Sequence, residues 1–247
     1  MEGLVSLILA AGQGKRMRSN LPKVLHEIDG LSLAEYVLQC ATKAGIGKHC
    51  IVVGHKKEMV EEVLGAEGRK FAVQKEPLGT GHAVSSAAET LKNMGAKHCL
   101  ILCGDTPCLT EKTIQEFLRD YEKNPDQILV LSTEVKNPHG YGRMIRGGDG
   151  ELICIREEKD CSEDEVLINE INTGIYLGSC TLILDLLKDI DNQNAQGEYY
   201  LTDIITNARE KGVEVKAINL GIEEEFLGVN SPEQLEEAKA VIRSRRI

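Results

Sequence analysis

Short apolar runs alternate with amphipathic stretches through the first half of this sequence, and this alternation restricts the fold more than any other feature. The runs have the length of β-strands, and the stretches between them carry apolar residues at helical spacing. Strands that are apolar at nearly every position are buried on both faces. The sequence therefore predicts an α/β fold, with a mainly parallel sheet covered by helices on both sides. The expected strands are 4–10, 49–54, 70–74, 98–105 and 127–135, and the expected helices are 33–45, 57–65, 81–95 and 110–124.

The regular alternation of expected strands and helices ends in the second half of the chain. Residues 141–160 resemble a hairpin with a Gly-Gly-Asp-Gly turn, and 172–178 reads as a further strand. Two helices and a strand at 212–220 follow. Residues 231–247 begin with a Ser cap and a Pro at the first helical position, so they predict a C-terminal helix. No long linker or internal repeat divides the chain, which favours one domain over 1–230 plus this helix.

Composition and charge exclude several classes of protein. Hydrophobic residues make up 42% of the 247 residues and charged residues 28%, which is ordinary for a globular protein. The net charge of -10 argues against a general nucleic-acid or anionic-membrane surface. No leader-like segment, membrane-length apolar run or C-x-x-C pair occurs. We expect a cytoplasmic protein with reduced cysteines, and no nucleic-acid, membrane or protein partner.

The positive charge that remains is concentrated in one glycine-containing loop, "LILAAGQGKRMRSNLPKVL" at 7–25. Gly12 and Gly14 suggest a dinucleotide fingerprint, but Met17 stands where the third glycine is required. The chain also lacks a P-loop motif. Either the loop holds a polyphosphate through backbone N–H groups and cations, or it is a flexible connection with solvated charges. Its cations are Lys15, Arg16, Arg18 and Lys23.

An aspartate follows the expected strand at 98–105, in the segment "CGDTP". At the carboxyl end of a buried strand, Asp105 would lie where open α/β sheets bind ligands. Its hard carboxylate oxygens suit Mg²⁺, which takes few protein ligands and completes its shell from phosphates and water. The alternative is a plain turn with Thr106 and Pro107.

Further polar segments separate the expected elements. Gln74 ends a strand and precedes a Gly-Thr-Gly turn, so its amide could pair with a nucleobase edge. The glycine-containing polar clusters at 139–143 and 170–174 resist a purely structural explanation, with turn chemistry as the alternative, whereas 196–203 reads best as a helix start. The six histidines lack metal-ligand spacing, and no G-x-S-x-G motif occurs, so we expect no covalent intermediate.

Taken in order, "LAAGQGKRM…PK", "QKEPLGTGHA", "GD", "YGR", "EINTG", "GEYYLTD" and "GVN" resemble one family. They are similar to the uridyltransferase domain of bifunctional N-acetylglucosamine-1-phosphate uridyltransferase/glucosamine-1-phosphate N-acetyltransferase, a sugar nucleotidyltransferase, over about residues 4–230. The resemblance implies a Rossmann-like sheet of the nucleotide-diphospho-sugar transferase type. It also implies Mg²⁺-dependent transfer of a uridylyl group from UTP to N-acetylglucosamine 1-phosphate by direct in-line attack, as in cell-wall synthesis.

The same resemblance implies roles for individual positions, all of which match the family motifs. The nucleotide would be held by Leu9, Ala10, Ala11, Gly12 and Gly14, with uracil read at Gln74, Gly79 and Thr80. The reacting phosphates would meet Arg16, Lys23 and Asp105, and Mg²⁺ would be bound by Asp105 and Asn230. The sugar would contact Gly104, Gly142, Glu157 and Asn172.

The sequence departs from the family pattern in two places. Cys103 precedes Gly-Asp where the family often has tyrosine, and the left-handed β-helix that forms the family's second half is not in this sequence. Residues 231–247 would then begin a linker to that absent domain, and we expect neither acetyltransferase activity nor the trimer that the domain forms.

Three other functions stay open at this stage. The nearest is a sugar-1-phosphate nucleotidyltransferase that uses dTTP, CTP or a different sugar. A non-catalytic nucleotide-sugar sensor is disfavoured by Lys23, Asp105 and Asn230, because a pure binder has little need for a metal site. A Rossmann oxidoreductase is disfavoured by Met17.

Overall fold

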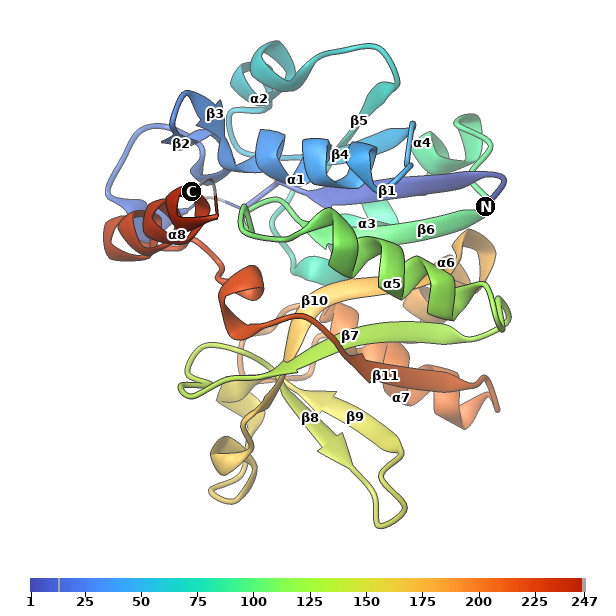
Figure 1. Cartoon of the computed structure of the whole chain (residues 1–247). Helices are drawn as coiled ribbons and strands as arrows, with labels where there is room; N and C mark the ends of the chain where they lie inside the picture. The colour runs from blue at the N-terminus through green and yellow to red at the C-terminus, as the bar shows by residue number, and fades with distance from the viewer. Residues whose placement is uncertain (13, 246–247) are drawn as a thin grey trace.

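The computed structural model describes residues 1–12 and 14–245 of the chain, and its centre is one mixed β-sheet (Figure 1). The sheet contains β1 (Leu4–Leu9), β4 (His49–Val53), β5 (Arg69–Val73), β6 (His98–Cys103), β7 (Ile128–Glu134), β10 (Glu170–Ser179) and β11 (Val215–Asn219), together with the hairpin β8 (Arg143–Arg146) and β9 (Leu152–Arg156). The helices are α1 (Leu33–Lys43), α2 (Lys57–Leu64), α3 (Thr80–Ser86), α4 (Ala88–Asn93), α5 (Glu111–Tyr121), α6 (Cys180–Leu186), α7 (Ile204–Glu210) and α8 (Pro232–Ser244).

The strand order is β11-β7-β10-β6-β1-β4-β5, with β8 paired to β10. Strand β1 runs parallel to both β4 and β6, β4 is parallel to β5, and β11 is parallel to β7. Only β10 runs antiparallel between its neighbours β6 and β7 on the main path of the described sheet. The predicted α/β class and the mainly parallel sheet are thus confirmed.

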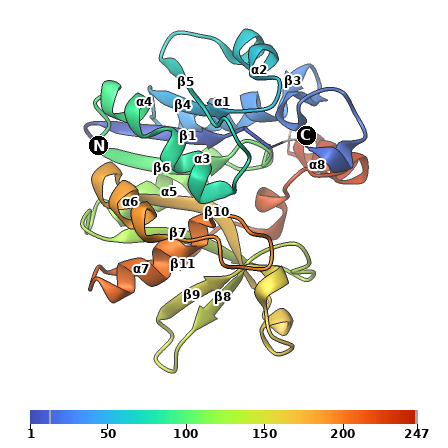
Figure 2. The same cartoon turned by 180° about the vertical axis from the view of Figure 1, so that it is seen from behind.

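Helices cover both faces of the sheet (Figures 1 and 2). Helices α1, α2 and α5 enclose one apolar cluster, and α3, α4, α6 and α7 enclose another. Successive side chains of β1 point to opposite faces, so Leu7 joins the second cluster and Ile8 the first. Both side chains are fully buried, as expected for a strand that is apolar throughout.

Two details differ from the predicted elements. The single helix expected at 81–95 is broken at Ala87 into α3 and α4. The Ser86 hydroxyl donates to the His82 carbonyl at 2.8 Å, and such i−4 bonding bends helices. The structure also adds a small hairpin, β2 (Glu27–Ile28) and β3 (Leu31–Ser32), which was not predicted. Its Asp29-Gly30 turn has two positive φ angles, the geometry for which Asp-Gly is favoured.

The C-terminal helix α8 packs against the opening loop of the chain. Ser231 caps it by accepting from the Gln234 N–H, as its sequence predicted. Its Ala238 and Ile242 are buried in a third apolar cluster that also contains Met17. Met17, which stands in place of the third glycine of a dinucleotide fingerprint, therefore packs the opening loop against α8. The helix ends at Ser244, and the last predicted positions, 246–247, lie outside the described residues.

Within the described part of the chain, no helix combines the length and apolar character that a membrane crossing requires.

Candidate active site

The carboxyl ends of the parallel strands border an open pocket of about 440 Å³. Leu9 and Cys103 end the adjacent strands β1 and β6, and Gln74 directly follows β5. This is the edge at which open α/β sheets bind ligands. The pocket is lined by Leu9, Ala11, Gly12, Lys23, Val24, Gln74, Pro77, Gly79, Thr80, Ala83, Cys103, Asp105 and Glu198.

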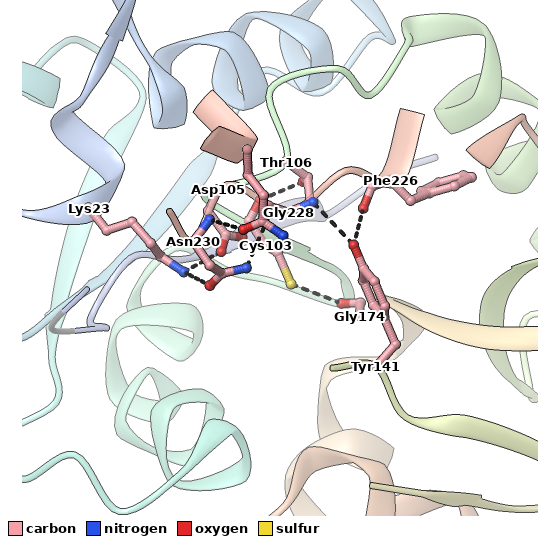
Figure 3. A network of polar contacts seen from close by, with 10 residues as sticks. Lys23, Cys103, Asp105, Thr106, Tyr141, Gly174, Phe226, Gly228 and Asn230 are labelled. Atoms are coloured by element: carbon pink, nitrogen blue, oxygen red, sulfur yellow. Dashed lines mark hydrogen bonds and ion pairs between the residues drawn. The ribbon is translucent and has the colours of Figure 1, made fainter. Parts of the chain in front are cut away.

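A charged cluster lies at one side of this pocket (Figure 3). The Lys23 ammonium contacts the Asp105 carboxylate and donates to Oδ1 of Asn230 at 2.9 Å. The Lys23 and Asp105 side chains are only 16% and 17% exposed. Three segments far apart in the sequence thus bring a cation, a carboxylate and an amide oxygen to one point.

The orientation of the Asn230 amide is fixed by its own loop. Nδ2 of Asn230 donates to the Gly228 carbonyl at 3.1 Å, which leaves Oδ1 directed at Lys23. The Asn230 backbone N–H donates to Oε1 of Gln234 at 2.9 Å. The Val229 N–H donates to the Asp105 carbonyl at 2.9 Å, so this loop is tied directly to the end of β6.

The other side of the pocket is formed by Gln74 and the Gly-Thr-Gly turn. Nε2 of Gln74 donates to the Gly79 carbonyl at 3.0 Å and lies 3.2 Å from Nδ1 of His82. Gly79 has φ 111°, and a Cβ built there would lie 2.6 Å from the Tyr199 carbonyl oxygen. Glycine is therefore required at this position by both conformation and space.

The segment "GEYYLTD" packs directly on this turn. The Gly81 N–H donates to the Tyr199 carbonyl, and the Tyr199 N–H donates to the Leu78 carbonyl, both at 2.8 Å. The Thr80 hydroxyl accepts from the Leu201 N–H at 3.0 Å. Residues 201–203 and then α7 follow, so the predicted helix start is confirmed, and the same segment also forms a wall of the pocket through Glu198.

Glu157 lies in a second, acidic pocket of about 290 Å³ that also contains Tyr200 and Asp203. Burial raises the pKa of Glu157, although the Thr202 hydroxyl donates to its Oε1 at 3.3 Å. Burial, with the nearby charges of Asp191 and Asp160, raises the pKa of Asp203 to about 6. Carboxyl groups held in this way are less readily ionised than exposed ones.

Gly142 and Asn172 lie beside one another, where the β8–β9 hairpin joins the sheet. The Asn172 N–H donates to the Gly142 carbonyl at 2.8 Å, and Oδ1 of Asn172 accepts from the Gly174 N–H at 3.0 Å. Gly174 sits at an irregularity of β10 with φ 77°, and its carbonyl lies 3.8 Å from the Cys103 thiol. The hairpin region thereby reaches the wall of the first pocket.

The structure brings together only part of the predicted set. Lys23, Asp105 and Asn230 form the charged cluster, and the first pocket adds Leu9, Ala11, Gly12, Gln74, Gly79 and Thr80. The predicted sugar positions Gly142, Glu157 and Asn172 lie outside that pocket, as described above. Four more predicted positions do not line it, namely Ala10, Gly14, Arg16 and Gly104.

Each of these four has a visible place in the structure. Ala10 is buried in the core beneath the sheet edge, and Gly104 lets β6 approach β1, where a Cβ would lie 2.9 Å from the Leu9 carbonyl. Gly14, at φ 61°, makes room for the stem of Lys23. Arg16 is exposed and makes no hydrogen bond or ion pair with the described residues. The side chain of Lys15, also named for the loop, lies outside what the structure describes.

Some residues at the site were not assigned from the sequence. Val24, Pro77, Ala83 and Glu198 line the first pocket, and each adjoins or belongs to a segment already noted for its pattern. Tyr141 was also missed, although its hydroxyl lies 3.5 Å from both the Phe226 carbonyl and the Gly228 N–H. Only its place in "YGR" could have suggested it, because the partner loop lies 85 residues away.

The donor set at the charged cluster fits a hard divalent cation. Oδ2 of Asp105 and Oδ1 of Asn230 converge on one point, and both are oxygen atoms of the type that Mg²⁺ prefers. Two protein oxygens match a metal that takes its other ligands from phosphate and water. Among the described residues, no group of three or more His, Cys, Asp or Glu side chains forms an all-protein metal cage.

A mixed sheet with an open pocket at its carboxyl edge, lined by Lys23, Gln74 and Asp105 among apolar residues, is an architecture found in α/β proteins that bind nucleotides. The chain belongs to the family of MobA-like NTP transferase domains, whose model matches residues 6–157. In fold it is similar to a UDP-glucose pyrophosphorylase complexed with UDP-glucose, with a TM-score of 0.80, 19% identity and 98% of each chain covered. It is likewise similar to an apo UDP-glucose pyrophosphorylase, with a TM-score of 0.80, 20% identity, and 98% of this chain and 99% of that one covered.

Curated relatives are similar over nearly the whole chain. It is 46% identical over 245 residues to the bifunctional protein GlmU of Caldanaerobacter subterraneus subsp. tengcongensis, covering 99% of this chain and 53% of the relative. It is 44% identical over 245 residues to the GlmU of Acetivibrio thermocellus, again covering 99% and 53%. The chain thus spans about half the length of the curated relatives that it matches.

Proposed function

We propose that this chain transfers a uridylyl group from UTP to N-acetylglucosamine 1-phosphate in the cytoplasm, releasing UDP-N-acetylglucosamine and pyrophosphate. The observation that carries the proposal is the cluster of Lys23, Asp105 and Asn230 beside a nucleotide-sized pocket at the sheet edge. The similarity to GlmU proteins, at 42–46% identity, supports a sugar-phosphate substrate. Mg²⁺ is the proposed cofactor, held by Asp105 and Asn230.

The transfer needs no covalent help from the chain. An oxygen of the sugar phosphate attacks the α-phosphorus in line, and pyrophosphate leaves on the opposite side. Lys23 stabilises the growing charge on the phosphate oxygens, and Arg16, exposed on the opening loop, is free to meet the triphosphate tail. The backbone at Gly12 adds donors where no side chain blocks the approach. Bound Mg²⁺ would supply further charge neutralisation at the phosphates.

The base would lie on the side of Gln74, Gly79 and Thr80. Gln74 is 7% exposed and held in place by the turn, so its amide offers a fixed pattern of donors and acceptors. A base that leaves a buried polar group unpaired loses roughly 1–3 kcal/mol of binding. That difference is enough to prefer UTP over CTP by a useful factor.

The sugar would lie between the two pockets, near Glu157, Asn172 and Gly142. Burial raises the pKa of Cys103, which lines the nucleotide pocket, and the charges of Asp105 and Glu157 add to this rise, so Glu157 lies near the wall of that pocket. A half-buried carboxylate is a good acceptor for sugar hydroxyls. Gly142 packs closely against Ile155 in this region, since a Cβ atom added at Gly142 would lie 3.1 Å from the Ile155 side chain.

The proposal is tested by pyrophosphate release with a panel of UTP, dTTP or CTP and of sugar 1-phosphates, in the presence of Mg²⁺. We expect release to require UTP and N-acetylglucosamine 1-phosphate together. Release with dTTP, or with glucose 1-phosphate instead, would retain nucleotidyl transfer but reassign the substrate. UTP binding without release from any pair would favour the non-catalytic sensor.

A further inference from the structure

The ammonium group of Lys23 occupies the point on which the proposed metal ligands converge. Its Nζ contacts Oδ2 of Asp105 and lies 2.9 Å from Oδ1 of Asn230, the same two oxygens that would bind Mg²⁺ (Figure 3). All three side chains are at least partly buried, so solvent screens their charges poorly.

An ammonium nitrogen and a divalent cation cannot share this point. Mg²⁺ lies about 2.0–2.1 Å from its oxygen ligands and holds them in near-octahedral geometry. Two cations so close together would also repel each other strongly in a partly buried site. The two oxygens can therefore be taken by Lys23 or by the metal, but not by both.

The Lys23 side chain can reach a second position, inside the nucleotide pocket. It lines the nucleotide pocket, and its flexible stem can carry the ammonium group to a new partner. The base of the Lys23 side chain is held in place, because Gly14 packs closely against it. A Cβ atom added at Gly14 would lie only 2.7 Å from the Cβ atom of Lys23. The base of the side chain is thus held while its end remains able to rotate toward the pocket.

We propose that Lys23 is a resident cation that holds Asp105 and Asn230 together until the metal and the nucleotide arrive, and that it then moves to the phosphates. This inference rests on the proposed function, because it takes the metal ligands and the triphosphate pocket from there. Lys23 thereby makes metal and nucleotide binding cooperative: metal alone must displace an ammonium group that has no phosphate to meet. Such coupling is reciprocal between the two ligands.

The test measures Mn²⁺ binding without nucleotide, by the electron paramagnetic resonance signal of free Mn²⁺. The neutral variants Lys23→Met and Lys23→Gln are expected to bind Mn²⁺ about tenfold more tightly than the wild type, within the usual range of coupling between sites. Lys23→Arg retains the positive charge and is expected to bind Mn²⁺ more weakly than either neutral variant, closer to the wild type. Lys216→Met serves as the matched control, because Lys216 forms an ion pair with Asp120 at 2.6 Å on the surface.

Two further results separate this inference from the proposed function. Asp105→Asn should lose Mn²⁺ binding; if it binds Mn²⁺ as the wild type does, the metal assignment of the proposed function fails. If Asp105→Asn loses binding but the neutral Lys23 variants bind equally or more weakly, only the resident-cation role is overturned. Weaker binding would mean that Lys23 merely supports the two ligands, and circular dichroism of each variant checks that it is folded.

Discussion

The carboxyl groups around Glu157 show how single residues acquire unusual properties from their surroundings. Glu157, Asp160 and Asp203 lie together with Asp189 and Asp191 in one pocket. Burial raises the pKa of Asp203, and repulsion from the neighbouring carboxylates raises it further. No sequence pattern could have indicated this, because these residues come from separate segments of the chain. The sequence did single out Glu157, but only through the family resemblance.

We predict that Asp203→Asn stabilises the protein at neutral pH. The pKa of Asp203 in the fold, about 6, is above its ordinary value of 3.8, so the fold favours the protonated form. Because the fold holds the protonated carboxyl group more favourably than the carboxylate, the stability that this protonated group contributes is fully present below about pH 4. That stability is lost as the pH rises through about 6 and Asp203 ionises inside the fold. Urea unfolding should therefore show a gain for the variant near pH 8 that shrinks near pH 4.5. A gain that is equal at both pH values would contradict the predicted pKa shift.

At the scale of elements, strands were the most predictable and local irregularities the least. The runs at 4–10, 49–54 and 98–105 gave β1, β4 and β6 nearly residue for residue, because a strand buried on both faces must be apolar throughout. The helix break at Ala87 was not predicted, since it accompanies a hydrogen bond from the Ser86 hydroxyl to the His82 carbonyl that the sequence pattern does not indicate. The irregularity of β10 at Gly174 was likewise not predicted.

We predict that Gly174→Ala destabilises the fold by about 1–3 kcal/mol, because φ 77° disfavours a side chain and its Cβ would lie 2.6 Å from the Cys103 sulfur. Adding Cys103→Ala removes the collision but not the backbone strain, so the double variant should recover part of the loss. Gly148→Ala is the control, since nothing lies within 4 Å of a Cβ there. Equal losses in the single and double variants, measured by urea unfolding, would rule out the collision.

At the scale of the whole molecule, the opening loop of the chain and the C-terminal helix α8 pack against each other, although they lie far apart in the sequence (Figure 1). Met17 joins α8 to the opening loop, and Asn230, just before α8, reaches Lys23 across 207 positions. The sequence predicted the helix and named Asn230, but it could not place either, because contacts at such separation follow from topology. The cluster of Lys23, Asp105 and Asn230 was therefore predictable as a list of residues and not as a geometry.

We predict that Met17→Ala lowers the free energy of unfolding by about 2–5 kcal/mol, the usual cost of emptying a buried methionine site. Met17 is 4% exposed and packs in the third cluster, whereas Met59 is 39% exposed. Met59→Ala should therefore change stability by no more than about 0.5 kcal/mol. Chemical unfolding of the two variants gives the comparison, and similar losses would mean that α8 does not hold the opening loop.

Asp105, which directly follows Gly104 at the end of β6, is proposed to organise a metal-dependent nucleotidyl transfer site. The most direct measurement is ³¹P nuclear magnetic resonance of UTP, N-acetylglucosamine 1-phosphate and Mg²⁺ with the wild type and with Asp105→Ala. We predict that the wild type forms UDP-N-acetylglucosamine and pyrophosphate in equal amounts, whereas folded Asp105→Ala forms neither. Product formation by Asp105→Ala at a rate near that of the wild type would contradict the claim.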